Sequence, residues 1–143
     1  MIANYDTREY PICKMLEMLD SGELILNLSA DFYRFPRLLE SIILDLPVSV
    51  MCRYKKQLIV GGNRLLEIKS FVEGEKKLIL SHCLYDNYEQ FYNEYNGLYF
   101  NELSYVIQEK FLAKSIRTIE VEDEATSTAF IVNHNLGSDT LCI

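Results

Sequence analysis

The chain lacks the long apolar run that a membrane-spanning helix needs. None of its apolar stretches approaches the roughly 20 residues required to cross a bilayer. Residues 1–6 also lack the basic and apolar regions of a secretory signal peptide. The sequence therefore predicts a cytoplasmic protein without a membrane partner.

Paired cysteines are missing as well. Cys13, Cys52, Cys83 and Cys142 are widely separated, with no C-x-x-C motif and no zinc-like spacing. This scatter favours reduced thiols that are buried as small apolar side chains. His82 and Cys83 form the one adjacent pair of metal-ligating residue types, but a zinc site needs three or four ligands. We therefore predict neither a metal centre nor a Cys–His catalytic dyad.

Basic residues are too few to cover the protein with positive charge. The 14 Lys and Arg residues stand against 21 Asp and Glu residues, for a net charge of −7. The charge is uneven, however, because residues 31–77 hold nine bases and six acids, whereas residues 78–143 hold three bases and ten acids. Non-specific duplex DNA binding requires a broad basic face, so we do not expect it. The basic middle segment either binds a compact anion or carries solvated surface charges.

The 143 residues contain no internal repeat, linker or low-complexity segment, which predicts a single domain over residues 1–143. Apolar stripes at helical spacing predict helices over residues 10–20, closed by Ser21-Gly22, and over 36–45, 63–73 and 101–114, the last capped by Asn101. Short apolar runs predict strands over residues 24–26, 48–52, 58–60, 78–80 and 116–121. The acidic turn at residues 122–124 starts a last helix. This mixture predicts an α/β (α+β) fold.

A stripe of tyrosines recurs at spacings of three and four residues, at Tyr85, Tyr88, Tyr92, Tyr95 and Tyr99. Such a stripe can stack on nucleic-acid bases or pack against a core. The residues interleaved with it include acids rather than Lys or Arg, so the sequence favours core packing.

A glycine pair in the middle of the chain is the most informative local feature. The apolar strand 58–60 leads into Gly61-Gly62, and Asn63 and Arg64 follow where an amphipathic helix begins. Backbone N–H groups and one guanidinium at such a turn are suited to holding an anion. No carboxylate stands in or beside the turn, so this run offers no acid or base group.

Several motifs occur in an order that resembles a known family. They read D-F-Y-R at residues 31–34, L-L-E-S-I-I-L at 38–44, L-P-V at 46–48, V-G-G-N-R-L at 60–65, F-V-E-G at 71–74, G-L-Y-F-N-E-L at 97–103 and N-L-G at 135–137. The chain is similar to the N-terminal domain shared by GmrSD-type modification-dependent restriction enzymes and by many bacterial and phage proteins. The resemblance implies a ParB/sulfiredoxin-like mixed sheet flanked by helices, and a link to restriction-modification and phage defence.

The resemblance also implies a pocket that binds a nucleotide and, in active members of the family, hydrolyses or cleaves its substrate. The candidate residues for a nucleotide or anion are Asp31, Arg34, Glu40, Gly61, Gly62, Asn63, Arg64 and Asn135. We expect Arg34, Glu40, Arg64 and Asn135 to surround a common concavity. The alternative role of Arg34 and Glu40 is a structural ion pair or helix cap.

The departures from the family pattern bear on catalysis. Val60 stands where the family motif D-G-Q-Q-R has its Asp, and Gly62 and Asn63 replace its two Gln residues. Tyr33 replaces the Gln of D-F-Q-R. The loss of the carboxylate removes a metal ligand or general base.

Two hypotheses follow. The first is a non-catalytic binding or regulatory module that recognises a nucleotide, another small anion or a protein partner. The second is a residual nucleotide-dependent hydrolase or nuclease that uses Asp31 and Glu40 in place of the lost Asp. The sequence favours the first, because such active sites need acids pre-positioned at the turn. No cofactor is predicted beyond the nucleotide itself.

Overall fold

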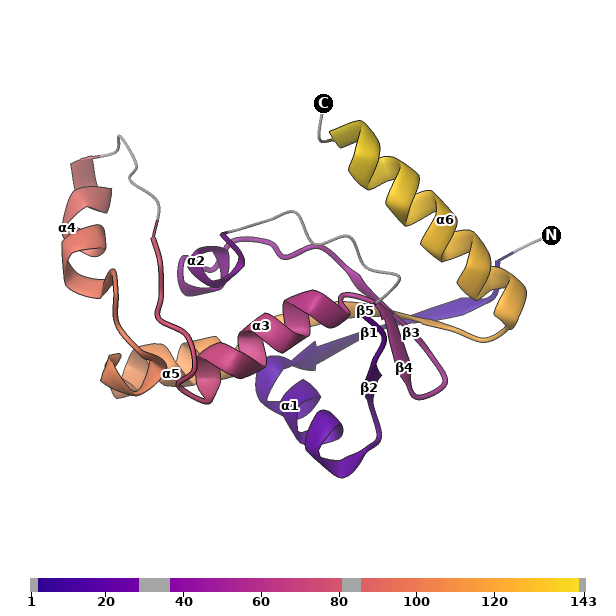
Figure 1. The fold of residues 1–143 in the computed structure, drawn as a ribbon, viewed down its shortest axis with the longest axis horizontal. Helices are drawn as coiled ribbons and strands as arrows, with labels where there is room; N and C mark the ends of the chain where they lie inside the picture. The colour runs from indigo at the N-terminus through magenta and orange to yellow at the C-terminus, as the bar shows by residue number, and fades with distance from the viewer. Residues whose placement is uncertain (1–2, 29–36, 81–85, 142–143) are drawn as a thin grey trace.

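The computed structural model describes residues 3–28, 37–80 and 86–141 (Figure 1). Its strands are β1 (Tyr5–Pro11), β2 (Ile25–Leu26), β3 (Met51–Tyr54), β4 (Gln57–Val60) and β5 (Ser115–Val121). Its helices are α1 (Ile12–Ser21), α2 (Leu38–Ile43), α3 (Gly62–Val72), α4 (Asp86–Tyr95), α5 (Tyr105–Ala113), α6 (Glu124–Leu141) and the short 3₁₀ turn η1 (Phe100–Glu102). The predicted mixed α/β fold is confirmed.

The strands form one mixed sheet in the order β1-β5-β3-β4-β2. Strand β1 runs antiparallel to β5 along its whole length, from Tyr5 opposite Val121 to Pro11 opposite Ser115. Strand β5 is parallel to β3, β3 is antiparallel to β4, and β4 is parallel to β2. The last strand in the sequence therefore lies between the first and the third.

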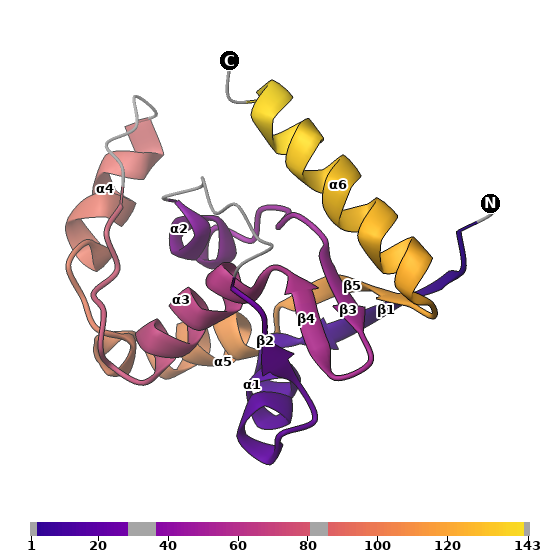
Figure 2. The ribbon, with the colours of Figure 1, turned by 45° about the vertical axis from the view of Figure 1, so that its right-hand side comes forward.

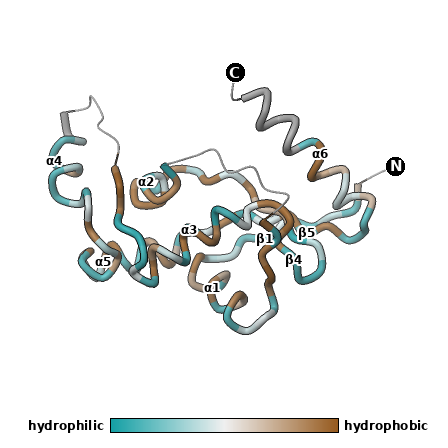
Figure 3. The backbone as a smooth tube through the Cα atoms, in the orientation of Figure 1, coloured by the Kyte–Doolittle hydropathy of each residue, from teal (hydrophilic) through white to brown (hydrophobic). Residues whose placement is uncertain are grey.

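Helices pack against both faces of this sheet (Figures 1 and 2). The larger apolar cluster joins α1, α2, α3 and α5 to the sheet and includes three contacting rings, Phe71, Phe100 and Phe111, with centroids 5.3–5.6 Å apart. The smaller cluster, which includes Cys52 and Val60, packs against α6. The neighbours Met51 and Cys52 belong to different clusters, as the alternation of a strand requires. Figure 3 shows that apolar residues occur on the helices, for example on α2, as well as on the strands.

Several predicted elements need correction. Strand β1 was not predicted, and Tyr10 belongs to it rather than to the following helix, which begins at Ile12. Residues 78–80 form no strand of the sheet, because Leu78 exchanges backbone hydrogen bonds with residues 97 and 98 instead. The predicted helix 101–114 is divided into η1 and α5, and Ser104 rather than Asn101 caps α5. The other predicted elements are present with bounds shifted by a few residues.

The predicted core packing of the tyrosine stripe is confirmed for Tyr92 and Tyr95, whereas Tyr99 is exposed and its ring contacts Lys77. Tyr92 and Tyr95 are partly buried against the larger apolar cluster, together with Phe91. The Phe91 ring contacts Tyr95 at a centroid distance of 5.0 Å and Tyr88 at 5.5 Å. Tyr85 lies outside the described residues. The described rings of α4 thus stabilise the helix on the domain.

Candidate functional site

The glycine turn lies between β4 and α3, as predicted from the sequence. Gly61 has a φ of +102°, which L side chains rarely adopt, and helix α3 begins at Gly62. A Cβ atom at Gly61 would lie 2.4 Å from Cγ of Met51, and one at Gly62 would lie 3.0 Å from the backbone oxygen of Asn27. The glycine pair therefore lets the turn approach its neighbours closely, in addition to any role toward a ligand.

Arg64 is buried, with only 4% of its surface exposed. Its guanidinium donates one hydrogen bond to the backbone oxygen of Ser49 at 2.6 Å and one to that of Val50 at 3.1 Å. Both acceptors belong to the segment that leads into β3. Arg64 thus ties this segment to α3, and the planar fork of the guanidinium fixes its orientation.

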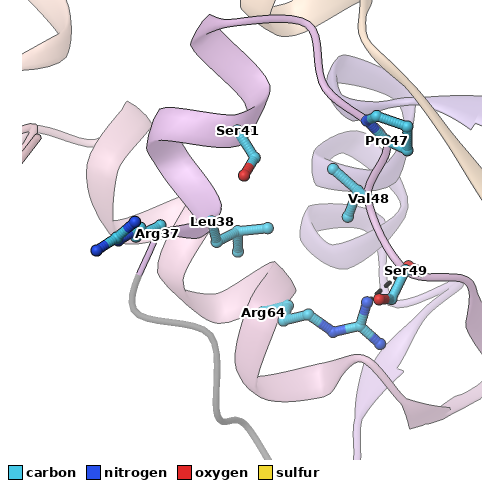
Figure 4. A pocket seen from close by; sticks show the side chains of 7 residues that line it. All are labelled: Arg37, Leu38, Ser41, Pro47, Val48, Ser49 and Arg64. Carbon is cyan, nitrogen blue, oxygen red and sulfur yellow. Dashed lines mark hydrogen bonds between the residues drawn. The ribbon is translucent and has the colours of Figure 1, made fainter. Parts of the chain in front are cut away.

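A cavity of about 320 Å³ lies beside the Arg64 guanidinium. It is lined by side chains from α2 and its N-terminal flank, from the segment before β3 and from α3, namely Arg37, Leu38, Ser41, Pro47, Val48, Ser49 and Arg64. Figure 4 shows Ser41 and Leu38 facing Val48 across this space, with Arg64 along one side of it. The Arg37 head group lies at the rim and points away from the other labelled side chains.

The chemistry of this cavity suits a small hydrogen-bonding anion. It combines the guanidinium of Arg64 with the hydroxyls of Ser41 and Ser49 and an apolar wall. The hydroxyls can donate hydrogen bonds to an anion as well as accept them. Among the described residues that line the cavity there is no carboxylate and no His, so they supply no proton acceptor for general base catalysis.

The structure places the predicted site residues in different surroundings. Gly61, Gly62 and Asn63 do not line this cavity, and the Asn63 side-chain amide instead lies 3.5 Å from the backbone oxygen of Leu28. Glu40 is buried on α2 but is not among the lining residues.

The side chains of three other candidates lie outside the described part of the structure. Asp31 and Arg34 lie outside the described residues. Asn135 lies within α6, beyond the last residue of that helix whose side chain is described. The expectation of a concavity shared by Arg34, Glu40, Arg64 and Asn135 thus stays a prediction.

Arg37, Ser41 and Ser49 are not among the site residues predicted from the sequence. Ser41 follows Leu38 by three residues and so shares its face of α2, which was a readable signal. Ser49, a polar residue between two valines, was a weaker one. Tertiary packing alone brings these two serines and Arg64 to the same cavity.

The cysteines and the acidic residues offer no metal centre in the described part of the chain. Cys52 is buried, and burial raises the pKa of its thiol to about 12, whereas Cys13 is exposed. The prediction of buried thiols is therefore right for Cys52 and wrong for Cys13. Cys83, Cys142 and His82 lie outside the described residues. Among the described residues, no group of three His, Cys, Asp or Glu side chains is placed to hold a metal ion.

Across residues 3–28, 37–80 and 86–141, no helix has the length and apolar character needed to cross a membrane. Comparison with known proteins finds no matching family model, no similar curated protein and no similar solved structure.

Proposed function

We propose that this protein is a non-catalytic module that binds a small anion, with the phosphate of a nucleotide as the candidate, in the cavity beside Arg64. The observation that carries the proposal is that a buried guanidinium and two serine side chains line the same hollow. By resemblance to GmrSD-type proteins, such a module would act as a regulator in restriction or phage defence.

Pre-organisation supports this proposal. The two backbone carbonyls of residues 49 and 50 hold the Arg64 head group in place before any ligand arrives. An anion that enters would therefore meet a donor whose rotamer is already fixed, and binding would cost less side-chain entropy. A charged donor in a partly desolvated cavity also binds an anion more strongly than one in water.

The lining of the cavity favours binding over the hydrolase alternative. That alternative uses Asp31 and Glu40 as the acidic groups; Glu40 does not line the hollow, and Asp31 lies outside the described residues. A guanidinium stabilises negative charge but does not accept a proton near neutral pH. Phosphate recognition without turnover is the outcome that these groups support.

The proposal can be tested by isothermal titration calorimetry with ADP, ATP and inorganic phosphate, each with and without Mg²⁺. Ser41→Leu should fill the cavity and weaken binding by about tenfold or more, which corresponds to about 1.4 kcal/mol. Ser70→Leu makes the same change on α3 at a position outside the lining and should leave the affinity unchanged. Arg64 is a poor first target because its loss would also release the backbone of residues 49 and 50.

Phosphate release from ATP is measured in parallel. We expect none above the blank, with or without Mg²⁺. The proposal is wrong if none of the three anions binds, if Ser41→Leu binds like the native protein, or if steady hydrolysis is observed. Hydrolysis that is lost in Glu40→Gln would restore the hydrolase hypothesis.

A further inference from the structure

The outer edge of β1 is a long, exposed strand edge. β1 is the first strand in the sheet order and pairs on one side only, with β5. Residues 5–9 are all exposed, with Tyr5 keeping 54% of its surface accessible. A free strand edge presents unpaired N–H and C=O groups that another strand can use.

The register shows which backbone groups point outward. The even-numbered residues at the two ends of the ladder bond toward β5, since Glu122 N–H donates to Asn4 O and Ile12 N–H donates to Lys114 O. Hydrogen bonding alternates along an antiparallel strand, so Tyr5, Thr7 and Glu9 direct their backbone groups to the free edge. No hydrogen bond within the described part of the chain uses those groups.

The side chains along this edge are self-complementary. Consider an antiparallel pair of two β1 strands centred on Thr7. Thr7 of one copy then faces Thr7 of the second, and Asp6 of each copy faces Arg8 of the other, on either side of the two-fold axis. Opposite charges and paired threonines both favour cross-strand contact. Arg8 and Asp6 lie on one face of the sheet, where Arg8 Nε is 3.7 Å from a carboxylate oxygen of Glu120.

Other registers are opposed by like charges. Sliding one copy by two residues keeps the outward backbone groups matched but places Asp6 opposite Asp6, or Arg8 opposite Arg8. Pro11 has no N–H to donate at the end of the strand. Charged residues on an edge strand oppose non-specific pairing with other strands. In β1, Asp6 and Arg8 favour the register centred on Thr7 between two copies.

We propose that the protein forms a two-fold symmetric dimer through antiparallel pairing of β1 with β1 of a second copy. The pairing adds about six backbone hydrogen bonds and two pairs of opposite charges. It joins the two sheets into one continuous sheet, with β1 in its middle. The occupant of the edge is a second copy of this chain because the strand is complementary to itself.

Sedimentation velocity over about 5–500 µM native protein tests this proposal, since a small polar interface predicts a micromolar dissociation constant. Asp6→Arg and Arg8→Asp should each raise the dissociation constant at least tenfold. An equimolar mixture of the two variants should dimerise again, because every facing pair in the mixed dimer has opposite charges. Thr7→Pro removes an outward N–H and should also weaken the dimer.

Matched controls separate this interface from general charge effects. Glu17→Arg and Lys14→Asp make the same charge changes on exposed residues of α1 and should leave dimerisation unchanged. Circular dichroism reports whether each variant is folded. The proposal is overturned if the native chain stays monomeric at the highest concentration, if Asp6→Arg dimerises like the native chain, or if the folded mixture associates no better than its components.

Discussion

Replacing Gly61 by Ala tests whether the glycine turn is required by packing. The new methyl group would sit 2.4 Å from Cγ and 2.8 Å from Sδ of Met51, well inside the contact distance of carbon and sulfur. The residue would also have to keep a φ of +102°. Both effects destabilise the folded state. Separately, alanine makes the unfolded chain slightly stiffer than glycine does.

The expected cost combines these terms. Holding Ala at a positive φ costs about 1 kcal/mol or slightly more. Overpacking a well-filled core costs about 1–3 kcal/mol, and the stiffer unfolded chain returns less than about 1 kcal/mol. We therefore expect Gly61→Ala to lower the free energy of unfolding by about 1–4 kcal/mol, measured by urea denaturation followed by circular dichroism.

Two further variants separate the steric term from the backbone term. Gly22 also has a positive φ, of +81°, but a Cβ added there would have no atom within 4 Å. Gly22→Ala should therefore lower the free energy of unfolding by only about 1 kcal/mol. Met51→Ala leaves a cavity and is destabilising by itself, since Met51 is fully buried. The double variant Gly61→Ala with Met51→Ala should lose about 1–3 kcal/mol less free energy of unfolding than the sum of the losses of the two single variants.

The reasoning is refuted if Gly61→Ala and Gly22→Ala cost the same. It is refuted equally if the two substitutions at positions 61 and 51 are additive, because then the methyl group and the Met51 side chain do not compete for space.

Three other predictions follow from described contacts. Mass spectrometry of iodoacetamide-treated native protein at pH 8 should show rapid modification of exposed Cys13 and none of buried Cys52, whose thiol pKa is raised to about 12; rapid modification of Cys52 would contradict its burial. A hydrogen bond from the Thr126 backbone N–H lowers the pKa of Asp123, so its capping of α6 is complete at neutral pH and is lost as the pH falls below about 4. Asp123→Asn should flatten the acid limb of a stability profile, and an unchanged limb would exclude this role. Arg64→Lys keeps the charge but replaces the rigid two-nitrogen fork with a single ammonium, and it should lower the free energy of unfolding by about 1–3 kcal/mol; an unchanged value in urea denaturation would show that the fork is dispensable.

The sequence predicts best those elements that carry their own local signal. The turn at Gly61 could be predicted because an apolar run, a glycine pair and a helical stripe follow one another directly. Strand β1 could not be predicted because its exposed sequence has no alternation of apolar and polar residues. The strand is stabilised by its backbone pairing with β5 and by ion pairs such as that of Arg117 with Glu9. These partners lie more than 100 residues away in the sequence.

Residues 78–80 show the opposite error. The buried, exposed, buried order of Leu78, Ile79 and Leu80 is the alternation of a strand. Their backbone partners, however, come from the loop at residues 96–98, which the pattern cannot reveal.

The candidate site was predicted in part. Arg64 was identified from its position after the turn, but its bonds to the backbone of residues 49 and 50 depend on how α3 packs against the segment before β3. The hydroxyls of Ser41 and Ser49 enter the same hollow for the same reason.

The position of β5 in the sheet has a consequence for how the chain acquires its structure during synthesis. Residues 115–121 emerge from the ribosome long after residues 5–11, yet β1 contacts the sheet only through β5. Until β5 is made, β1 has no strand to pair with, and β3 lacks a neighbour on one side. Closing this long loop is slow compared with local pairing, so the strands β3 and β4 can form their hairpin first. Completion of the sheet is then a late step that converts a nascent β3–β4 hairpin into the native domain.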